Sequence, residues 1–119
     1  MKTTGEHYER LAARWLEARG LTIISRNYSC KAGEIDLIAR DGRHLVFIEV
    51  RARSNPRYAS AAGSVDKRKQ LRLLRTARHY LQQQPLAGAT PCRFDVITFE
   101  PRQSPAGTVV RWIRSAFTD

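Results

Sequence analysis

Apolar residues recur at helical spacing in two separate stretches of the chain. The first stretch, from about residue 5 to residue 19, places on one face Tyr8, Leu11, Ala12, Trp15 and Leu16. The second stretch, from about residue 65 to residue 84, places on its buried face Leu71, Leu73, Leu74, Ala77, Tyr80 and Leu81. Gly20 is a stop signal for the first helix, while Ser64 or Asp66 would cap the second and Pro85 would end it. The pattern therefore predicts two amphipathic helices.

Runs of apolar and β-branched residues predict five strands in the rest of the chain. These runs cover residues 21–28, 35–39, 45–50, 93–100 and 108–114. Together with the helices they give the order α-β-β-β-α-β-β, which indicates an α/β fold with a mixed sheet flanked by helices. Because the 119 residues contain no repeat and no low-complexity tract, we expect a single domain over residues 1–119.

The second and third strands form a predicted hairpin around residues 41–42, and both strands carry acidic residues. A carboxylate inside an apolar strand is costly unless something pairs with it. A loop over residues 41–44 would place Asp36 opposite Glu49, and a two-residue loop would place Glu34 opposite Glu49 instead. A three-residue loop would scatter the carboxylates. Two of the three registers thus bring Glu34, Asp36 and Glu49 within reach of one divalent cation, which commonly binds crowded carboxylates.

The charge balance indicates an anionic partner. The chain has 21 Lys and Arg residues against 11 Asp and Glu residues, a formal net charge of +10. Nucleic acid is favoured over a membrane because the basic second helix also has a full apolar face for a core. That helix would carry a basic stripe formed by Arg68, Arg72, Arg75 and His79. The alternatives are basicity that serves solubility and a stripe that is only solvated, although the stripe has no interleaved acids.

Other features narrow the setting and the chemistry. Cys30 and Cys92 form no CxxC motif, so we expect a reduced, cytoplasmic protein and no zinc site. No apolar run reaches membrane-spanning length, and the N-terminal residues lack the apolar core of a signal peptide. The chain has no P-loop, no GxGxxG motif and no GxSxG elbow. The acidic hairpin is therefore the main candidate for a catalytic or metal-binding site. The sequence is also compatible with a homodimer.

The hairpin resembles the motif of the PD-(D/E)xK nuclease superfamily, in which an αβββαβ core presents an Asp and then E-x-K on the next strand. More closely, the chain resembles the UPF0102 (YraN-like) family of small bacterial proteins over nearly its whole length. The matching segments are GEIDLI at 33–38 and FIEVRAR at 47–53, with Gly5-Glu6, Arg26-Asn27, Lys69-Gln70, Ala77, Tyr80-Leu81 and residues 93–96. The resemblance implies a restriction-endonuclease-like fold. It also implies hydrolysis of phosphodiester bonds in DNA, including branched or structured DNA, with Mg²⁺ or Mn²⁺ as cofactor.

Carried over position by position, the resemblance implies a set of metal ligands. Asp36 matches the motif Asp and Glu49 matches the Glu of E-x-K, and the carbonyl of Val50 would add a third oxygen. Glu6 matches the acid on the first helix that completes the site in the resolvase-like branch of the superfamily. A capping box with Thr3 is an alternative role for Glu6.

The cationic part of the motif departs from the superfamily pattern. Arg51 stands where the motif has Lys, and arginine can bind the scissile phosphate but cannot act as a base. The predicted catalytic residues are Asp36, Glu49 and Arg51, and Lys69 is a candidate substitute for the motif lysine. The predicted nucleic-acid-binding residues are Arg53, Arg68, Lys69, Arg72 and Arg75.

Three functions stay open on the sequence. The first is a Mg²⁺-dependent nuclease, and the second is a nuclease-fold protein that has lost most of its catalysis and binds nucleic acid. The third is a basic scaffold for another macromolecule, in which acids only pair with arginines. Glu34 would then face Arg51 across the hairpin, and Asp95 is in any case expected to hold Arg93 or a loop.

Overall fold

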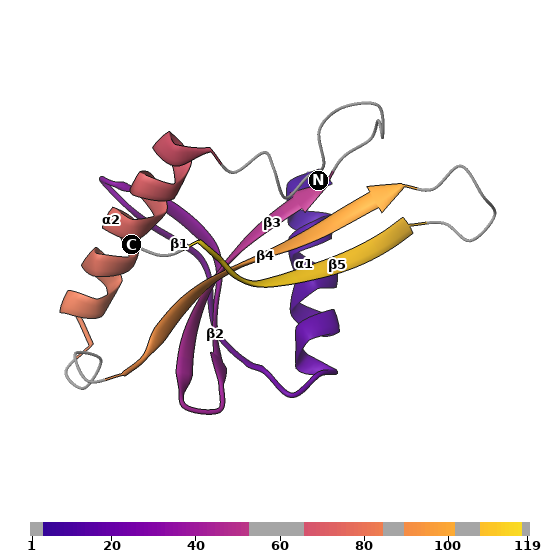
Figure 1. The fold of residues 1–119 in the computed structure, drawn as a ribbon, viewed down its shortest axis with the longest axis horizontal. Coiled ribbons are helices and arrows are strands. Elements are labelled where there is room, and N and C mark those ends of the chain that lie inside the picture. Colours follow the sequence, from indigo (N-terminus) through magenta and orange to yellow (C-terminus); the bar gives the residue numbers. More distant parts are fainter. Residues whose placement is uncertain (1–3, 53–65, 85–89, 102–107, 118–119) are drawn as a thin grey trace.

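A five-stranded mixed sheet carries one helix on each face (Figure 1). The computed structural model describes residues 4–52, 66–84, 90–101 and 108–117. Along the chain the elements are α1 (Thr4–Glu17), β1 (Thr22–Cys30), β2 (Gly33–Asp41), β3 (His44–Ala52), α2 (Lys67–Gln82), β4 (Cys92–Pro101) and β5 (Thr108–Phe117). The predicted element order and α/β class are confirmed, and the arrangement is compatible with a restriction-endonuclease-like core. No helix in these ranges is long and apolar enough to cross a membrane.

The strands lie in the sheet in their chain order, β1-β2-β3-β4-β5. β1, β2 and β3 form an antiparallel meander, and β5 returns antiparallel to β4. β3 and β4 are parallel, because the connection that contains α2 crosses over between them. This crossover places the start of α2 beside the C-terminal end of β3.

The β2–β3 hairpin has the register predicted for the 41–44 loop, because Arg40 pairs with Leu45. Asp41 and His44 also pair, so only Gly42 and Arg43 turn, and Gly42 takes the left-handed φ of +60° that such a turn requires. The regular pairing ends at Leu37 and Ile48. Continued by one step, the same register places Asp36 opposite Glu49.

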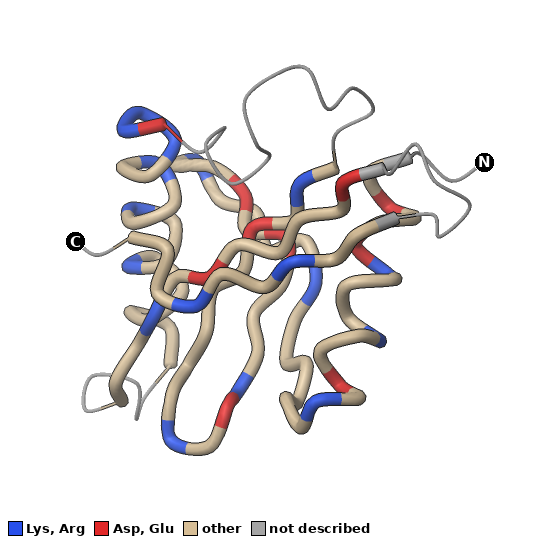
Figure 2. Tube along the Cα trace, turned by 45° about the vertical axis from the view of Figure 1, so that its right-hand side comes forward, with Lys and Arg blue, Asp and Glu red and all other residues tan. Residues whose placement is uncertain are grey.

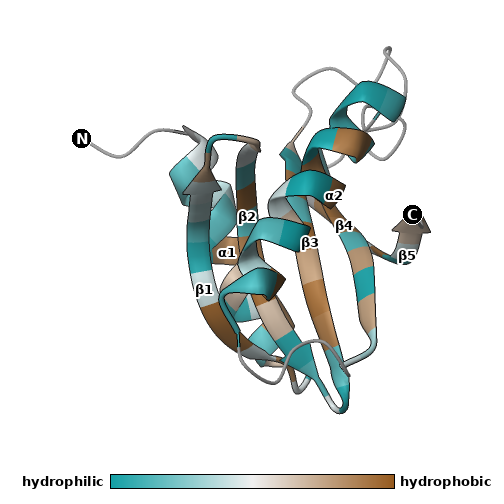
Figure 3. Ribbon diagram, turned by 90° about the vertical axis from the view of Figure 1, so that its left-hand side faces the viewer, coloured by the Kyte–Doolittle hydropathy of each residue, from teal (hydrophilic) through white to brown (hydrophobic). Residues whose placement is uncertain are grey.

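Each helix buries a narrow stripe of side chains against its own face of the sheet. Figure 3 shows α2 in front of the sheet and α1 behind it. In α1 the fully buried residues are Ala12, Ala13 and Leu16, and Leu11 is 37% exposed, because it lies about 150° around the helix from this stripe. The prediction that Leu11 faces the core was therefore wrong.

In α2 the buried residues are Leu73, Thr76, Ala77 and Tyr80. Leu71 lies on the opposite side of the helix and is 51% exposed, so its predicted burial was also wrong. Thr76 fills a buried position because its hydroxyl donates to the carbonyl of Arg72 at 2.8 Å. Asp66 is the N-cap, accepting from the backbone N–H of Lys69 at 2.9 Å, and the alternative cap Ser64 lies outside the described residues.

Asp95 on β4 is fully buried, and it pairs with Ile48 of the neighbouring strand β3. Its carboxylate accepts hydrogen bonds from Arg93 Nε at 3.1 Å, from Trp112 Nε1 at 2.8 Å and from the backbone N–H of Ser115 at 3.0 Å. Arg93 also donates to Asp41 at 2.7 Å. The expectation that Asp95 holds Arg93 is confirmed.

Candidate functional site

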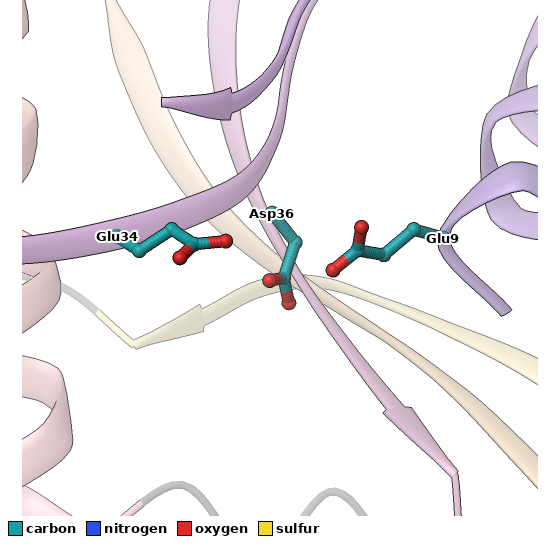
Figure 4. Close-up of side chains that lie close together, drawn as sticks. All are labelled: Glu9, Glu34 and Asp36. Carbon is teal, nitrogen blue, oxygen red and sulfur yellow. The ribbon is translucent and has the colours of Figure 1, made fainter. Parts of the chain in front are cut away.

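Three carboxylates meet where β2 leaves its pairing with β3. Glu9 reaches them from α1, and Glu34 and Asp36 come from β2, with one oxygen of each within 4.8 Å of the others. Figure 4 shows Asp36 between the other two, with the carboxylates of Glu9 and Glu34 directed toward it. Asp36 is fixed in this place, because its Oδ2 accepts the backbone N–H of Val50 at 2.8 Å.

Glu49 on β3 is the fourth acid of the site and is only 6% exposed. Burial raises the pKa of Glu49 to about 7, and repulsion from Asp36 contributes in the same direction. Two cations act against this rise: Lys69 Nζ lies 3.2 Å and Arg51 Nε lies 3.6 Å from Glu49 Oε1. Lys69 comes from the first turn of α2, which the crossover brings to this end of the sheet.

Glu9 also has a raised pKa, for similar reasons. Burial raises its pKa to about 7, aided by the charge of Asp36 and a hydrogen bond to it, whereas a hydrogen bond with Asn27 lowers it. Asp36 therefore disfavours the ionised form of a carboxylate on each side of it. A divalent cation would relieve this repulsion.

The donor set fits a hard cation such as Mg²⁺ or Mn²⁺. All four side chains offer carboxylate oxygens, the ligands that these ions prefer, and Asp36 is already oriented by the backbone. Two clefts meet at Asp36 and Glu49. One faces α1, has a volume of about 340 Å³ and is also lined by Gly5, Tyr8, Glu9, Val50, Arg51 and Ala52. The other faces α2, has a volume of about 280 Å³ and is also lined by Gly33, Glu34, Lys69, Arg72 and Leu73.

Arg51 is held in an unusual way for a cation. Its side chain is 25% exposed, but its Nε atom is buried and has no hydrogen-bond partner within the described residues. Thr98, which pairs with Arg51 across β3 and β4, likewise has a buried Oγ1 without a partner there. Arg51 thus brings an unused N–H donor to the carboxylates.

The basic stripe of α2 lies next to the second cleft. Arg68, Arg72 and Arg75 are exposed, and Figure 2 shows Lys and Arg repeated along α2 while acidic residues gather near the middle of the sheet. The aliphatic part of Arg72 lies against Gly33, so its guanidinium borders the site. His79 is also exposed, and its Nδ1 forms a hydrogen bond with the hydroxyl of Tyr28 on β1.

The structure brings most of the predicted site residues together, with differences in detail. Asp36, Glu49, Arg51 and the backbone of Val50 surround one point, and Lys69 joins them instead of the exposed stripe. The predicted metal ligand Glu6 is exposed and is not part of the three-carboxylate group. Arg53 and Thr3 lie outside the described residues. In the described part of the chain Glu34 forms no ion pair with Arg51, which pairs with Glu49 instead.

Sequence reasoning missed Glu9 and Asn27. The signal for Glu9 was its position, because it precedes the buried Ala12, Ala13 and Leu16 by three, four and seven residues and so lies on the buried stripe of α1. An acid in such a place is a strong candidate for a site. Asn27 carried a weaker signal: its left-handed φ of +53° is a feature of the backbone that no spacing rule predicts.

Comparison with known proteins finds relatives over nearly the whole chain. Residues 8–99 match the model of the family described as "Uncharacterised protein family UPF0102". A "UPF0102 protein" of Aeromonas hydrophila is 50% identical over 114 residues, 95% of this chain and 83% of the relative. One from Alcanivorax borkumensis is 47% identical over 98% of this chain and 92% of its own length. The "UPF0102 protein YraN" of Escherichia coli is 47% identical over 99% of this chain and 86% of its own length. The chain therefore belongs to the UPF0102 family.

Proposed function

We propose that this protein is a divalent-metal-dependent nuclease that hydrolyses phosphodiester bonds in nucleic acid, with DNA as its substrate. One observation carries the proposal. Carboxylates from α1, β2 and β3 converge on Asp36, and a lysine from α2 approaches the same point. Acids that only served stability would each pair with a cation. Here Glu9, Glu34 and Asp36 face one another, and Glu49 is the acid of the group that pairs with Lys69 and Arg51.

The carboxylates of Glu9, Asp36 and Glu49 would hold the metal, with Glu34 as an exposed fourth donor. When bound, the metal would supply activation of water and stabilisation of the negative charge that develops on the phosphate. The hydrogen bond from Val50 holds Asp36 in place, so the central ligand keeps its position without a bound ion. Burial of Glu49 keeps water away from this side of the site and strengthens its electrostatic interactions.

The two cations would divide the role of the motif lysine. Lys69 Nζ, at 3.2 Å from Glu49, lies where an ammonium group can orient a water molecule or hold a phosphate oxygen. Arg51 stays protonated, and its guanidinium, on a side chain that is 25% exposed, can bind the scissile phosphate. The orientation of water therefore falls to Lys69 and phosphate binding to Arg51.

The test is cleavage of labelled DNA by the purified protein with Mg²⁺ or Mn²⁺. Single-stranded, duplex and branched substrates should be compared, with EDTA as the metal-free control. Asp36→Asn is expected to abolish cleavage, and Glu17→Gln, an exposed acid on the same helix as Glu9, should leave it unchanged. Absence of cleavage on every substrate with either metal, or equal cleavage by Asp36→Asn, would refute the proposal.

A second candidate is a nucleic-acid-binding module that has lost most of its catalysis. The observation that favours it is Arg51 at the lysine position, with Lys69 and Arg51 both directed at Glu49. In that case DNA binding would persist in Asp36→Asn while no metal supports cleavage. An Arg51→Lys variant that gains activity would instead show that the carboxylate site is competent and only weakened.

A further inference from the structure

A row of stacked rings and guanidinium groups connects α1 to β5, away from the carboxylates. Arg19 lies over the indole ring of Trp15, with its Cζ 3.4 Å from the ring centroid. Trp15 meets Trp112 edge to face at 5.9 Å between centroids, and Arg114 lies over Trp112 at 4.1 Å. The row thus runs Arg19, Trp15, Trp112, Arg114, and we call it the Arg–Trp row.

Both outer arginines are oriented but not neutralised. Arg19 donates from Nη1 to the carbonyl of Trp15 at 3.0 Å, and Trp112 is fixed by its hydrogen bond to Asp95. Arg19 and Arg114 are exposed, and neither forms an ion pair within the part of the chain that the structure describes. A guanidinium stacked on a ring still presents N–H groups at its edge, in the planar arrangement that matches phosphate, although one Nη1–H of Arg19 is used by the carbonyl of Trp15. Its side chain is already ordered, so binding costs less conformational entropy.

The row lies on the face of the sheet that α1 covers, opposite the basic stripe of α2. Trp15 and Trp112 both pack against the α1-side core, whereas α2 covers the other core. Trp15 follows Glu9 by six residues on the same helix, which is about 9 Å along the axis. Phosphates along one nucleic-acid strand are spaced closely enough for one bound molecule to reach both the row and the carboxylate site.

We infer that the Arg–Trp row is a second nucleic-acid contact surface, in which Arg19 and Arg114 bind backbone phosphates and the indoles hold them in place. The partner follows from the chemistry of the row and from the net charge of +10, which attracts a polyanion. The inference rests on the proposed function only for the identity of this partner. If the arginines only covered the two tryptophans, replacing them would leave the affinity for nucleic acid unchanged. DNA-binding measurements distinguish these two roles.

The experiment is DNA binding in EDTA, so that cleavage plays no part. Fluorescence anisotropy of labelled single-stranded and duplex DNA should compare the wild type with Arg19→Gln/Arg114→Gln. The matched control is Arg40→Gln/Arg43→Gln, which removes the same charge from exposed arginines at the β2–β3 hairpin. The row variant is expected to lose at least about tenfold in affinity, and its salt slope on duplex DNA should fall by about 1.8, the value for two lost phosphate contacts. The control should lose less than about twofold through its remote charge.

Tryptophan emission gives an independent readout, because Trp15 and Trp112 are the two tryptophans of the chain. DNA should change the emission of the wild type at low salt, and added salt should reverse the change. Arg19→Lys/Arg114→Lys should recover the salt slope but not the full affinity, since lysine keeps the charge and loses the planar stacking.

Equal loss of DNA affinity in the row variant and the control, or DNA binding without any change in emission, would overturn the inference. Preference of the row for an acidic protein over DNA at equal salt would overturn it as well. If the wild type cleaves no DNA but the row variant still loses DNA affinity, the proposed nuclease activity is refuted and the Arg–Trp row is supported as a contact surface.

Discussion

Replacing Asp36 by Asn should make the metal-free protein more stable. Asp36 contributes to the raised pKa of both Glu9 and Glu49, so its charge opposes ionisation on two sides. At 4.8 Å and an effective dielectric constant of 20, two unit charges repel by about 3 kcal/mol, which solvent screening at the half-buried Glu9 reduces to about 1 kcal/mol. Glu49 is 6% exposed, so its repulsion is screened less. Against this, a neutral amide oxygen accepts the N–H of Val50 less strongly, at a cost of about 1 kcal/mol.

The balance predicts a net gain of about 1 to 2 kcal/mol for Asp36→Asn at pH 8, or about 3 to 8 °C in Tm for a domain of this size. The pH dependence of stability independently gives the sign of the effect of Asp36→Asn. The folded-state pKa of Glu49 is raised from 4.5 to about 7, so the stability from its protonation is complete below about pH 4.5 and is lost as the pH rises to about 7. For this buried group the loss is about 3 kcal/mol. The wild type should therefore lose stability across that window, and Asp36→Asn should lose less.

Urea unfolding in EDTA between pH 4.5 and pH 8, followed by Trp emission, measures both effects. Mn²⁺ provides the second half of the assay, because an ion that binds the folded state at 100 times its Kd stabilises it by about 2.7 kcal/mol. Mn²⁺ should stabilise the wild type and leave Asp36→Asn nearly unchanged. If Asp36→Asn is less stable than the wild type in EDTA at pH 8, or gains as much from Mn²⁺, then Asp36 is a structural acid and the reasoning fails.

Three further substitutions test other parts of the structure. Lys69→Met should slow DNA hydrolysis by at least about 100-fold and raise the pKa of Glu49, which Lys69 lowers, and a pH–rate profile checks both. Thr98→Val should leave stability unchanged or raise it by about 1 kcal/mol, because the buried Oγ1 has no partner in the described residues, and a clear loss in urea unfolding would contradict this. Asp95→Ala should cost about 3 kcal/mol or more in the same assay, because it leaves Arg93 and the N–H of Trp112 without their buried acceptor.

The fold could be predicted largely from local patterns. Alternating apolar runs and the turn at Gly42 determine the strands and the hairpin register, because a shift of one residue would move the whole apolar set to the wrong face. The helix faces were harder to predict. Leu71 is apolar and exposed whereas Thr76 is polar and buried, since a threonine can satisfy its hydroxyl within its own helix. Composition alone does not distinguish these cases.

The geometry of the site could be predicted only where its residues share a hairpin, although Lys69 was already a candidate substitute for the motif lysine. Asp36 and Glu49 follow from strand alternation, but Glu9 and Lys69 come from helices whose positions depend on tertiary packing. Both helices nevertheless carried a signal. Lys69 precedes the buried Leu73 by four residues and Thr76 by seven, so it lies on the buried stripe of α2 just as Glu9 lies on that of α1. A charged residue on the buried stripe of each helix, beside acids on the strands between them, is the pattern that would have predicted the complete site.

Under the proposed function, the charges at this point decide when substrate can bind there. The four acids carry up to four negative charges and Lys69 and Arg51 carry two positive charges, which leaves an excess of up to two negative charges among these six groups. Such an excess repels phosphate locally even though the protein as a whole attracts it. One divalent cation removes the excess, so phosphate should enter the carboxylate site only together with the metal, whereas binding to the α2 stripe needs no metal. DNA affinity should then have a metal-independent part that Asp36→Asn preserves and a metal-dependent part that it removes.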